Sequence, residues 1–148
     1  MAQFARPSAD TNNPDAYTDQ GGGSSTIYAT IDESVASDSD YIRTVVSPTN
    51  DVYVTKLSNV TDPLSSTGHI MRMRTSCDQD AQETLDFTLQ LRQGYVSEGS
   101  PGTLIATLSR AGVSSTTWTD SSYTLSGAEA DAITDYTSLY YRLLINKP

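Results

Sequence analysis

The residue types that most often carry out catalysis are scarce in this chain and lack the spacing that catalysis needs. His69 is the only histidine, and no nucleophile-elbow pattern places a serine on the sharp turn that a hydrolase requires. We therefore expect His69 to be solvated or to form a cap. Cys77 is the only cysteine, so neither an internal disulfide nor a metal site of Cys and His ligands can form. We predict a small, partly buried Cys77 at a strand end and a chain that is not an enzyme and needs no cofactor.

Two groups of carboxylates remain as candidates for metal or sugar chemistry. The first contains Asp32, Glu33, Asp38 and Asp40, and the second contains Asp78, Asp80, Glu83 and Asp86. Calcium takes about six to eight oxygen ligands, and a retaining glycosidase needs two facing carboxylates. Neither group has the spacing of a defined calcium loop. Solvated acidic loops are expected, with calcium binding and glycosidase chemistry as alternatives.

Aromatic side chains are a third source of chemistry, because they stack on sugars and anchor protein interfaces. The chain has nine tyrosines and one tryptophan. Trp118 and Tyr140 are the candidates for an exposed binding surface, although Trp118 could instead pack in the core or at a sheet edge. Adjacent Tyr140 and Tyr141 must point to opposite faces of a strand.

The charge balance argues against polyanionic partners. The formal net charge is −9 and the pI is about 4.3, which opposes binding to nucleic-acid phosphates and to anionic membrane surfaces. No apolar run approaches the ~20 residues of a membrane helix, and no signal-peptide pattern occurs. We expect no nucleic acid, no membrane and no signal peptide.

Alternating hydrophobicity predicts the scaffold that must hold these residues. Between Glu83 and Arg92, apolar residues recur at every second position, which gives a strand one apolar face. A lone strand of this kind is unstable, so a second layer must cover it. Met71 and Met73 alternate with arginines in the preceding strand and should meet that face. The predicted core residues are Leu85, Phe87, Leu89, Leu91, Met71 and Met73.

The remaining pattern consists of short strands separated by turns. We predict an all-β, antiparallel, jelly-roll-like sandwich of about eight strands, and the last strand should be central because it is densely apolar. In residues 51–57, either Val52 and Val54 or Tyr53, Thr55 and Leu57 could face inward. A capping box that begins at Ser126 predicts one short helix over 126–134. The strands are predicted at 26–31, 41–46, 51–57, 69–75, 83–92, 103–109, around 118–123 and at 138–145.

Residues 1–25 are predicted to form an extended N-terminal arm, and residues 26–148 the domain. Prolines, glycines and scattered polar residues cannot bury enough surface to fold alone, so the arm should be clamped on its own domain or by a neighbouring chain. Phe4 and Tyr17 are its only large apolar anchors. Gly21, Gly22 and Gly23 are expected to act as a hinge between arm and domain.

Four segments resemble small β-rich virion proteins of tailed bacteriophages. They are RPSAD at 6–10, YATIDESVASDSDYI at 28–42, VTDPLSSTGHIMRMR at 60–74 and LSGAEADAITDYTSLYYRL at 125–143. The resemblance implies a structural β-sandwich and supplies no catalytic residues.

This resemblance implies a capsid decoration or cement protein, made in the host cytoplasm and placed on the outer capsid surface. Its partners would be the major capsid protein and copies of itself, as a homotrimer. The arm would tie neighbouring capsomers together through Phe4, Arg6, Pro7 and Tyr17. The alternative is a glycan- or receptor-binding module of a tail fibre or appendage, and a cellular carbohydrate-binding domain is a third candidate.

Overall fold

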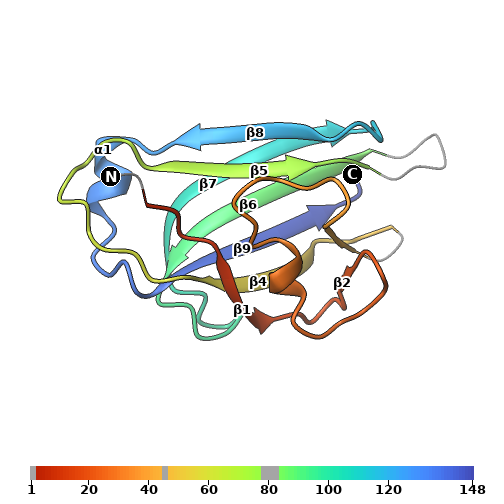
Figure 1. Ribbon diagram of the computed structural model, residues 1–148, viewed down its shortest axis with the longest axis horizontal. Coiled ribbons are helices and arrows are strands. Elements are labelled where there is room, and N and C mark those ends of the chain that lie inside the picture. The colour runs from red at the N-terminus through yellow and green to blue at the C-terminus, as the bar shows by residue number, and fades with distance from the viewer. Residues whose placement is uncertain (1–2, 45–46, 78–83) are drawn as a thin grey trace.

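One antiparallel sheet of five strands forms the larger layer of the molecule (Figure 1). The computed structural model describes residues 3–44, 47–77 and 84–148. In spatial order the strands are β1 (Pro7–Asn12), β4 (Asp51–Leu57), β9 (Leu139–Asn146), β6 (Leu85–Gln93) and β7 (Thr103–Val113). The dense apolar pattern of β9 is explained by its central position, because both of its edges are paired.

A second layer consists of β5 (Ile70–Thr75) and β8 (Thr119–Thr124), which pair with each other. The pairs are nested along the chain: β6 pairs with β7, β5 with β8 and β4 with β9. Nested antiparallel pairs that fold over into two layers are the connectivity of a jelly roll. The predicted all-β antiparallel sandwich is therefore confirmed, with nine strands in the described residues.

Short elements complete the fold. These are the two-residue strands β2 (Thr18–Asp19) and β3 (Ile42–Arg43), the 3₁₀ helix η1 (Ile27–Thr30) and the helix α1 (Gly127–Asp131). The capping box holds as predicted, since Ser126 Oγ accepts from the Glu129 N–H at 3.3 Å and Glu129 Oε2 accepts from the Ser126 N–H at 2.7 Å. Within the described residues, neither helix has the length and hydropathy to cross a membrane.

The strand predicted over 26–31 is wrong, because Ile27–Thr30 form η1. The reason is a tertiary contact. The Asp10 carboxylate of β1 accepts hydrogen bonds from the Ile27 and Tyr28 N–H groups, each at 2.9 Å, so the two amides converge on one side chain. Of the strand predicted over 41–46, only Ile42–Arg43 is paired, and residues 45 and 46 lie outside the described part.

The core lies between the two layers. Phe87, Leu89, Leu91 and Met71 are each less than a tenth exposed, and Leu85 and Met73 are partly buried against them. Buried Cys77 packs in the same core, at the end of β5.

Both alternatives for β4 turn out to be buried, on opposite faces. Tyr53 and Leu57 pack between the layers. Val52 and Val54 pack on the other face of the sheet, against Tyr95. A strand covered on both faces has no polar side, which is why the alternation in this stretch was ambiguous.

The N-terminal segment is clamped on its own domain, which is one of the two alternatives expected from the sequence, and residues 7–12 belong to the sandwich. Residues from Pro7 to Asn12 pair with β4 as the edge strand β1. Tyr17 is fully buried and donates its hydroxyl proton to the Asp51 carbonyl at 3.0 Å. Tyr17 is thus a core residue rather than a surface for a partner. An open edge of β4 and a buried slot for one aromatic ring hold a segment whose own composition predicts no fold.

The three glycines form a compact loop on the domain. The Asp19 carboxylate accepts hydrogen bonds from the Gly21 and Gly23 N–H groups, both at 2.8 Å. A Cβ atom on Gly23 would lie 2.5 Å from Asp19 Oδ2, and Gly22 has a φ of +87°. These positions require glycine to close the loop around Asp19, and the segments on both sides of the loop lie on the domain.

Candidate functional site: an apolar cavity at one end of the sandwich

A cavity of about 350 Å³ lies at the end of the sandwich where the N-terminus and α1 are found (Figure 1). Its walls come from the inner face of the large sheet, from the start of β5, from the segment after α1 and from residues 3–5. Residues that line it include Ala5, Leu57, Val60, His69, Met71, Leu91, Leu125, Ile133, Tyr136, Leu139 and Tyr141.

Three large apolar side chains are exposed to solvent at this cavity and at a second, smaller hollow that adjoins it. Phe4 is 61% exposed, Leu64 is 89% exposed and Ile70 is 47% exposed. We call the cavity and these three residues the open end. Scattered exposed apolar residues are ordinary, but a group around one apolar cavity is typical of interaction sites.

His69 and Tyr136 form a pair at the cavity wall. His69 Nε2 and the Tyr136 hydroxyl are 2.8 Å apart, and this is the only hydrogen bond found for that hydroxyl within the described residues. Burial raises the pKa of Tyr136, and the charges of Asp62 and Asp131 raise it further. The phenol thus keeps its proton, and the imidazole tautomer decides which of the two groups donates in this hydrogen bond.

Two polar groups at the cavity lack partners among the residues that the structure describes. His69 Nδ1 is buried without a hydrogen bond. Tyr141 also lines the cavity, and burial raises its pKa to about 12. Its hydroxyl makes no hydrogen bond to any described residue. Because buried polar groups are normally satisfied, His69 Nδ1 marks a place where a ligand or water would bind, and the Tyr141 hydroxyl is a second polar group at the same cavity.

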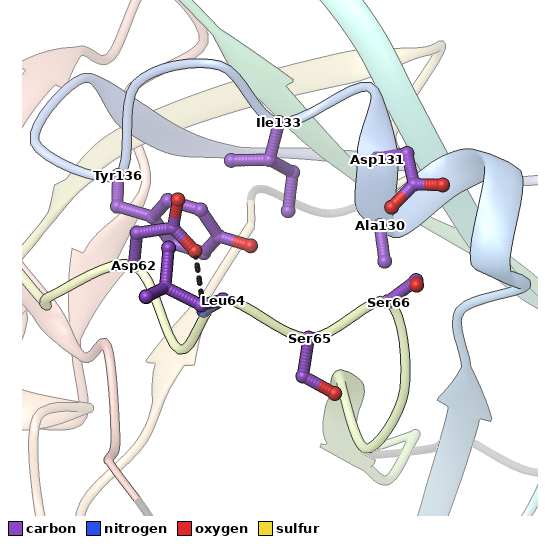
Figure 2. A pocket seen from close by; sticks show the side chains of 8 residues that line it. All are labelled: Asp62, Leu64, Ser65, Ser66, Ala130, Asp131, Ile133 and Tyr136. Carbon is purple, nitrogen blue, oxygen red and sulfur yellow. Dashed lines mark hydrogen bonds between the residues drawn. The ribbon is translucent and has the colours of Figure 1, made fainter.

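A second hollow of about 250 Å³ adjoins the cavity and shares Ile133 and Tyr136 with it. Figure 2 shows Asp62 and Asp131 on opposite sides of this hollow, with Tyr136 beside Asp62. Asp62 Oδ1 accepts from the Leu64 N–H at 2.7 Å, which shapes the loop that carries Leu64. The open end therefore combines an apolar cavity with carboxylates next to it.

The first residues of the chain form one wall of the cavity. The Gln3 side-chain amide exchanges two hydrogen bonds with the Thr61 backbone, at 2.9 and 2.8 Å. The Arg6 and Ser58 backbones are joined at 2.7 Å. The Arg6 guanidinium lies 5.4 Å from the centre of the Phe4 ring, a cation–π distance. This wall is held by polar contacts while its apolar ring faces water.

The aromatic residues singled out from the sequence lie elsewhere and are not brought together. Trp118 is half-buried and packs on Tyr41, with ring centres 5.5 Å apart. Tyr140 is half-buried and packs on Tyr95 at 5.8 Å, on the outer face of the large sheet. Tyr141 points to the opposite, inner face, as the alternation requires.

In the first acidic group, Asp38 is ion-paired and Glu33 is partly buried near two other carboxylates. Arg74 pairs with both oxygens of Asp38, at 2.7 and 2.9 Å, and with Asp120 at 3.1 Å. These Arg74 hydrogen bonds lower the pKa of Asp38. Burial raises the pKa of Glu33, with smaller contributions from Asp40 and Asp32.

In the second group, Asp86 accepts a hydrogen bond from the Gly112 N–H at 2.8 Å. Asp78, Asp80 and Glu83 lie outside the described residues. In the described part of the chain, no cluster of three or more His, Cys, Asp or Glu side chains is arranged to hold a metal ion.

The sequence reading missed most of the open end. His69 was expected to be solvated or capping, but it is partly buried and bonded to Tyr136. Tyr136 and Leu64 were not singled out, and Tyr141 was considered only as the neighbour of Tyr140 on the opposite face of the strand. No local pattern marks them, because the cavity is made by segments that are far apart in the sequence.

Comparisons with protein-family models, with curated proteins and with solved structures found no match to this chain.

Proposed function

We propose that the chain is a virion structural protein of a tailed bacteriophage, and that it decorates the outer capsid by docking its open end on the shell. The observation that carries the proposal is the grouping of exposed Phe4, Leu64 and Ile70 around an apolar cavity. Such a patch is stabilised when a protein partner covers it.

The segments that resemble virion proteins support this surface in particular. Residues 60–74 supply one side of the open end and residues 125–143 supply the opposite side. Residues 6–10 begin beside Phe4 and lead into β1. Three of the four segments behind the resemblance therefore meet at the proposed docking surface, whereas residues 28–42 line neither the cavity nor the hollow.

The N-terminal segment has a narrower role in this proposal than an extended arm would have. Phe4 and Arg6 are placed to contact a neighbouring capsomer, while the residues from Pro7 onward stay paired with β4. The acidic remainder of the surface, with a net charge of −9, would face the solvent and keep particles apart. Trimers at threefold positions belong to the same proposal.

The first test locates the protein in the particle. Virions of the phage that encodes the chain are purified, copy number is measured by quantitative mass spectrometry, and position by immunogold electron microscopy. We expect gold on the head and a copy number comparable with that of the major capsid protein. Gold on the tail would overturn decoration in favour of the receptor-binding alternative, and absence from virions would overturn both.

The second test asks which surface attaches. Capsids that lack the protein are incubated with the full chain and with Phe4→Ser/Leu64→Ser. We expect the double variant to lose attachment. The matched control is Val35→Ser/Val96→Ser, because these side chains are 78% and 76% exposed and line neither the cavity nor the hollow. Equal attachment by Phe4→Ser/Leu64→Ser and the wild type would contradict docking through the open end.

A further inference from the structure

The cavity at the open end has room for a large side chain. Its volume of about 350 Å³ exceeds the roughly 150 Å³ in which an engineered protein cavity holds benzene, and it lies in the usual range of roughly 300–1,000 Å³ for ligand sites. Aliphatic and aromatic residues such as Leu57, Met71, Leu91 and Leu139 line it. A phenylalanine or leucine side chain is the kind of group that this lining stabilises.

The polar atoms of the cavity specify what must accompany that apolar group. His69 Nε2 is bonded to the Tyr136 hydroxyl, so Nδ1 is the ring atom left for a ligand, and it donates in one tautomer and accepts in the other. Tyr141 presents a protonated hydroxyl, which can donate or accept. A peptide group is uncharged and has one N–H donor and one carbonyl acceptor, so it can pair with either atom in either role.

The charged side chains beside the cavity indicate which partner residues would flank the inserted apolar side chain. Asp62 and Asp131 lie on the adjoining hollow that shares Ile133 and Tyr136 with the cavity. Their charges reach Tyr136, whose pKa they help to raise. A lysine or arginine next to the inserted apolar residue would complement them.

The size of the exposed apolar surface points to a protein occupant. A small molecule inside the cavity would leave Phe4, Leu64 and Ile70 in water, whereas a polypeptide crossing the opening would cover them. Apolar anchors that fill pockets, surrounded by a polar and charged rim, are the usual energetic centres of protein interfaces.

From these features we infer that the cavity receives a large apolar side chain from a partner protein, with a backbone peptide group of that protein hydrogen-bonded to His69 Nδ1 or the Tyr141 hydroxyl. Adjacent basic residues of the partner pair with Asp62 and Asp131. This inference rests on the proposed function in one respect, namely that the partner is a protein subunit of the virion.

The test is a titration of the ¹⁵N-labelled full chain with capped tripeptides, followed by amide chemical shifts. The probes are Ac-Lys-Phe-Lys-NH₂, Ac-Glu-Phe-Glu-NH₂ and Ac-Lys-Gly-Lys-NH₂. We expect saturable shifts at Ile70, Met71, Leu125 and Ile133 with the first peptide and none with the glycine peptide. The glutamate peptide should bind roughly tenfold more weakly, as two exposed ion pairs would give.

Two variants with matched controls locate the binding. Ala5→Phe places a ring in the cavity and should abolish the shifts, whereas Ala29→Phe, on the exposed side of η1, should leave them intact. Asp62→Asn/Asp131→Asn should remove the preference for the lysine peptide. The control Asp32→Asn/Asp40→Asn should retain it. The charge variants alter side chains outside the core, so they decide the question even if Ala5→Phe does not fold.

The outcomes separate this inference from the proposed function. No saturable shift at the cavity, or full binding by a folded Ala5→Phe variant, would overturn the cavity inference even if the protein is found on capsids. Equal affinity of the wild type for the two charged peptides would contradict the inference that basic residues of the partner pair with Asp62 and Asp131. Specific peptide binding by a protein that is absent from virions would support the cavity inference and overturn the capsid role.

Discussion

The two ends of the sandwich differ in whether their buried polar side chains have hydrogen-bond partners. At the end opposite the cavity, a cluster that we call the closed end contains Tyr17, Ile27, Tyr53, Cys77, Phe87, Val113 and Ile145. There, both buried tyrosine hydroxyls have partners: Tyr17 donates to the Asp51 carbonyl at 3.0 Å, and Tyr53 donates to Asp10 at 2.6 Å. At the open end, His69 Nδ1 is buried without a partner among the described residues.

The N-terminal segment contributes residues to both ends, because it runs from one end of the sandwich to the other (Figure 1). Near the closed end, Asp10 binds two amides of η1 and Asp15 accepts from the Val52 N–H at 2.7 Å. At the open end, Phe4 of the same segment is left exposed. The difference predicts that the closed end contributes more to stability than the open end, where we propose that a partner binds.

The largest expected effect is a charge in the closed end. Phe87→Asp should cost about 5 kcal/mol or more, because it leaves an unpaired ion in the core, and that is comparable with the whole stability of a domain of this size. Ile70→Asp, the matched change at the open end, should cost less than about 1 kcal/mol. Thermal melting followed by circular dichroism measures both. A normal melting transition in Phe87→Asp would break the comparison.

The next effect is the loss of the carboxylate that joins β1 to η1 and Tyr53. Asp10→Ala should lower the free energy of unfolding by about 2–3 kcal/mol, since the buried Tyr53 hydroxyl and two amides lose a charged acceptor. Asp131→Ala, at the open end, should change it by less than about 0.5 kcal/mol. Urea unfolding of both variants measures the difference. Similar midpoints would show that polar contacts do not distinguish the two ends.

Alkaline pH should act first on the closed end. Burial raises the pKa values of Tyr17 and Tyr53 above the usual tyrosine range, and the charges of Asp51 and Asp10 raise them further. The unfolded chain therefore loses these protons first. Stability is complete below about pH 10, the ordinary tyrosine value, and falls as the pH rises above it.

Absorbance at the tyrosinate band should consequently rise in two stages, the second coinciding with loss of the β-sheet circular dichroism signal. Tyr53→Phe removes one of these groups and should make unfolding less dependent on pH in this range. A single stage completed while the sheet signal persists would mean that the closed end admits hydroxide or opens locally.

The smallest effect should come from filling the open end. Ala5→Met adds a flexible apolar side chain at the cavity wall and should stabilise the protein by about 1 kcal/mol. Ala29→Met, on exposed η1, is the control and should have no measurable effect. Melting temperatures of the two variants decide this, and a lower value for Ala5→Met would mean that the cavity wall has no room.

Much of the scaffold followed from local patterns. Alternation in Leu85–Gln93 and Leu139–Asn146 indicated strands, and the Ser126 capping box indicated α1, because side-chain direction and capping depend on neighbours in the sequence. The dense apolar content of β9 also indicated its central place, since only a strand covered on both faces tolerates it.

The N-terminal segment shows where local patterns fail. Its composition predicts an unfolded arm, yet Asp10, Asp15 and Tyr17 bind it to β4 and η1. The same contacts turned the predicted strand at 26–31 into η1. These outcomes depend on an edge strand that needs a partner and on amides that need acceptors, and both lie far away along the chain.

The sequence by itself thus determined the fold class, the central strands, the inward face of β6 and the charge that disfavours polyanionic partners. Only the tertiary structure decided that the arm belongs to the sandwich and that His69, Tyr136 and Tyr141 meet at one cavity. The physical reason is that hydrophobic periodicity reports which side of an element is buried. It does not report how completely two layers fill the space between them, and that space forms the candidate site of this protein.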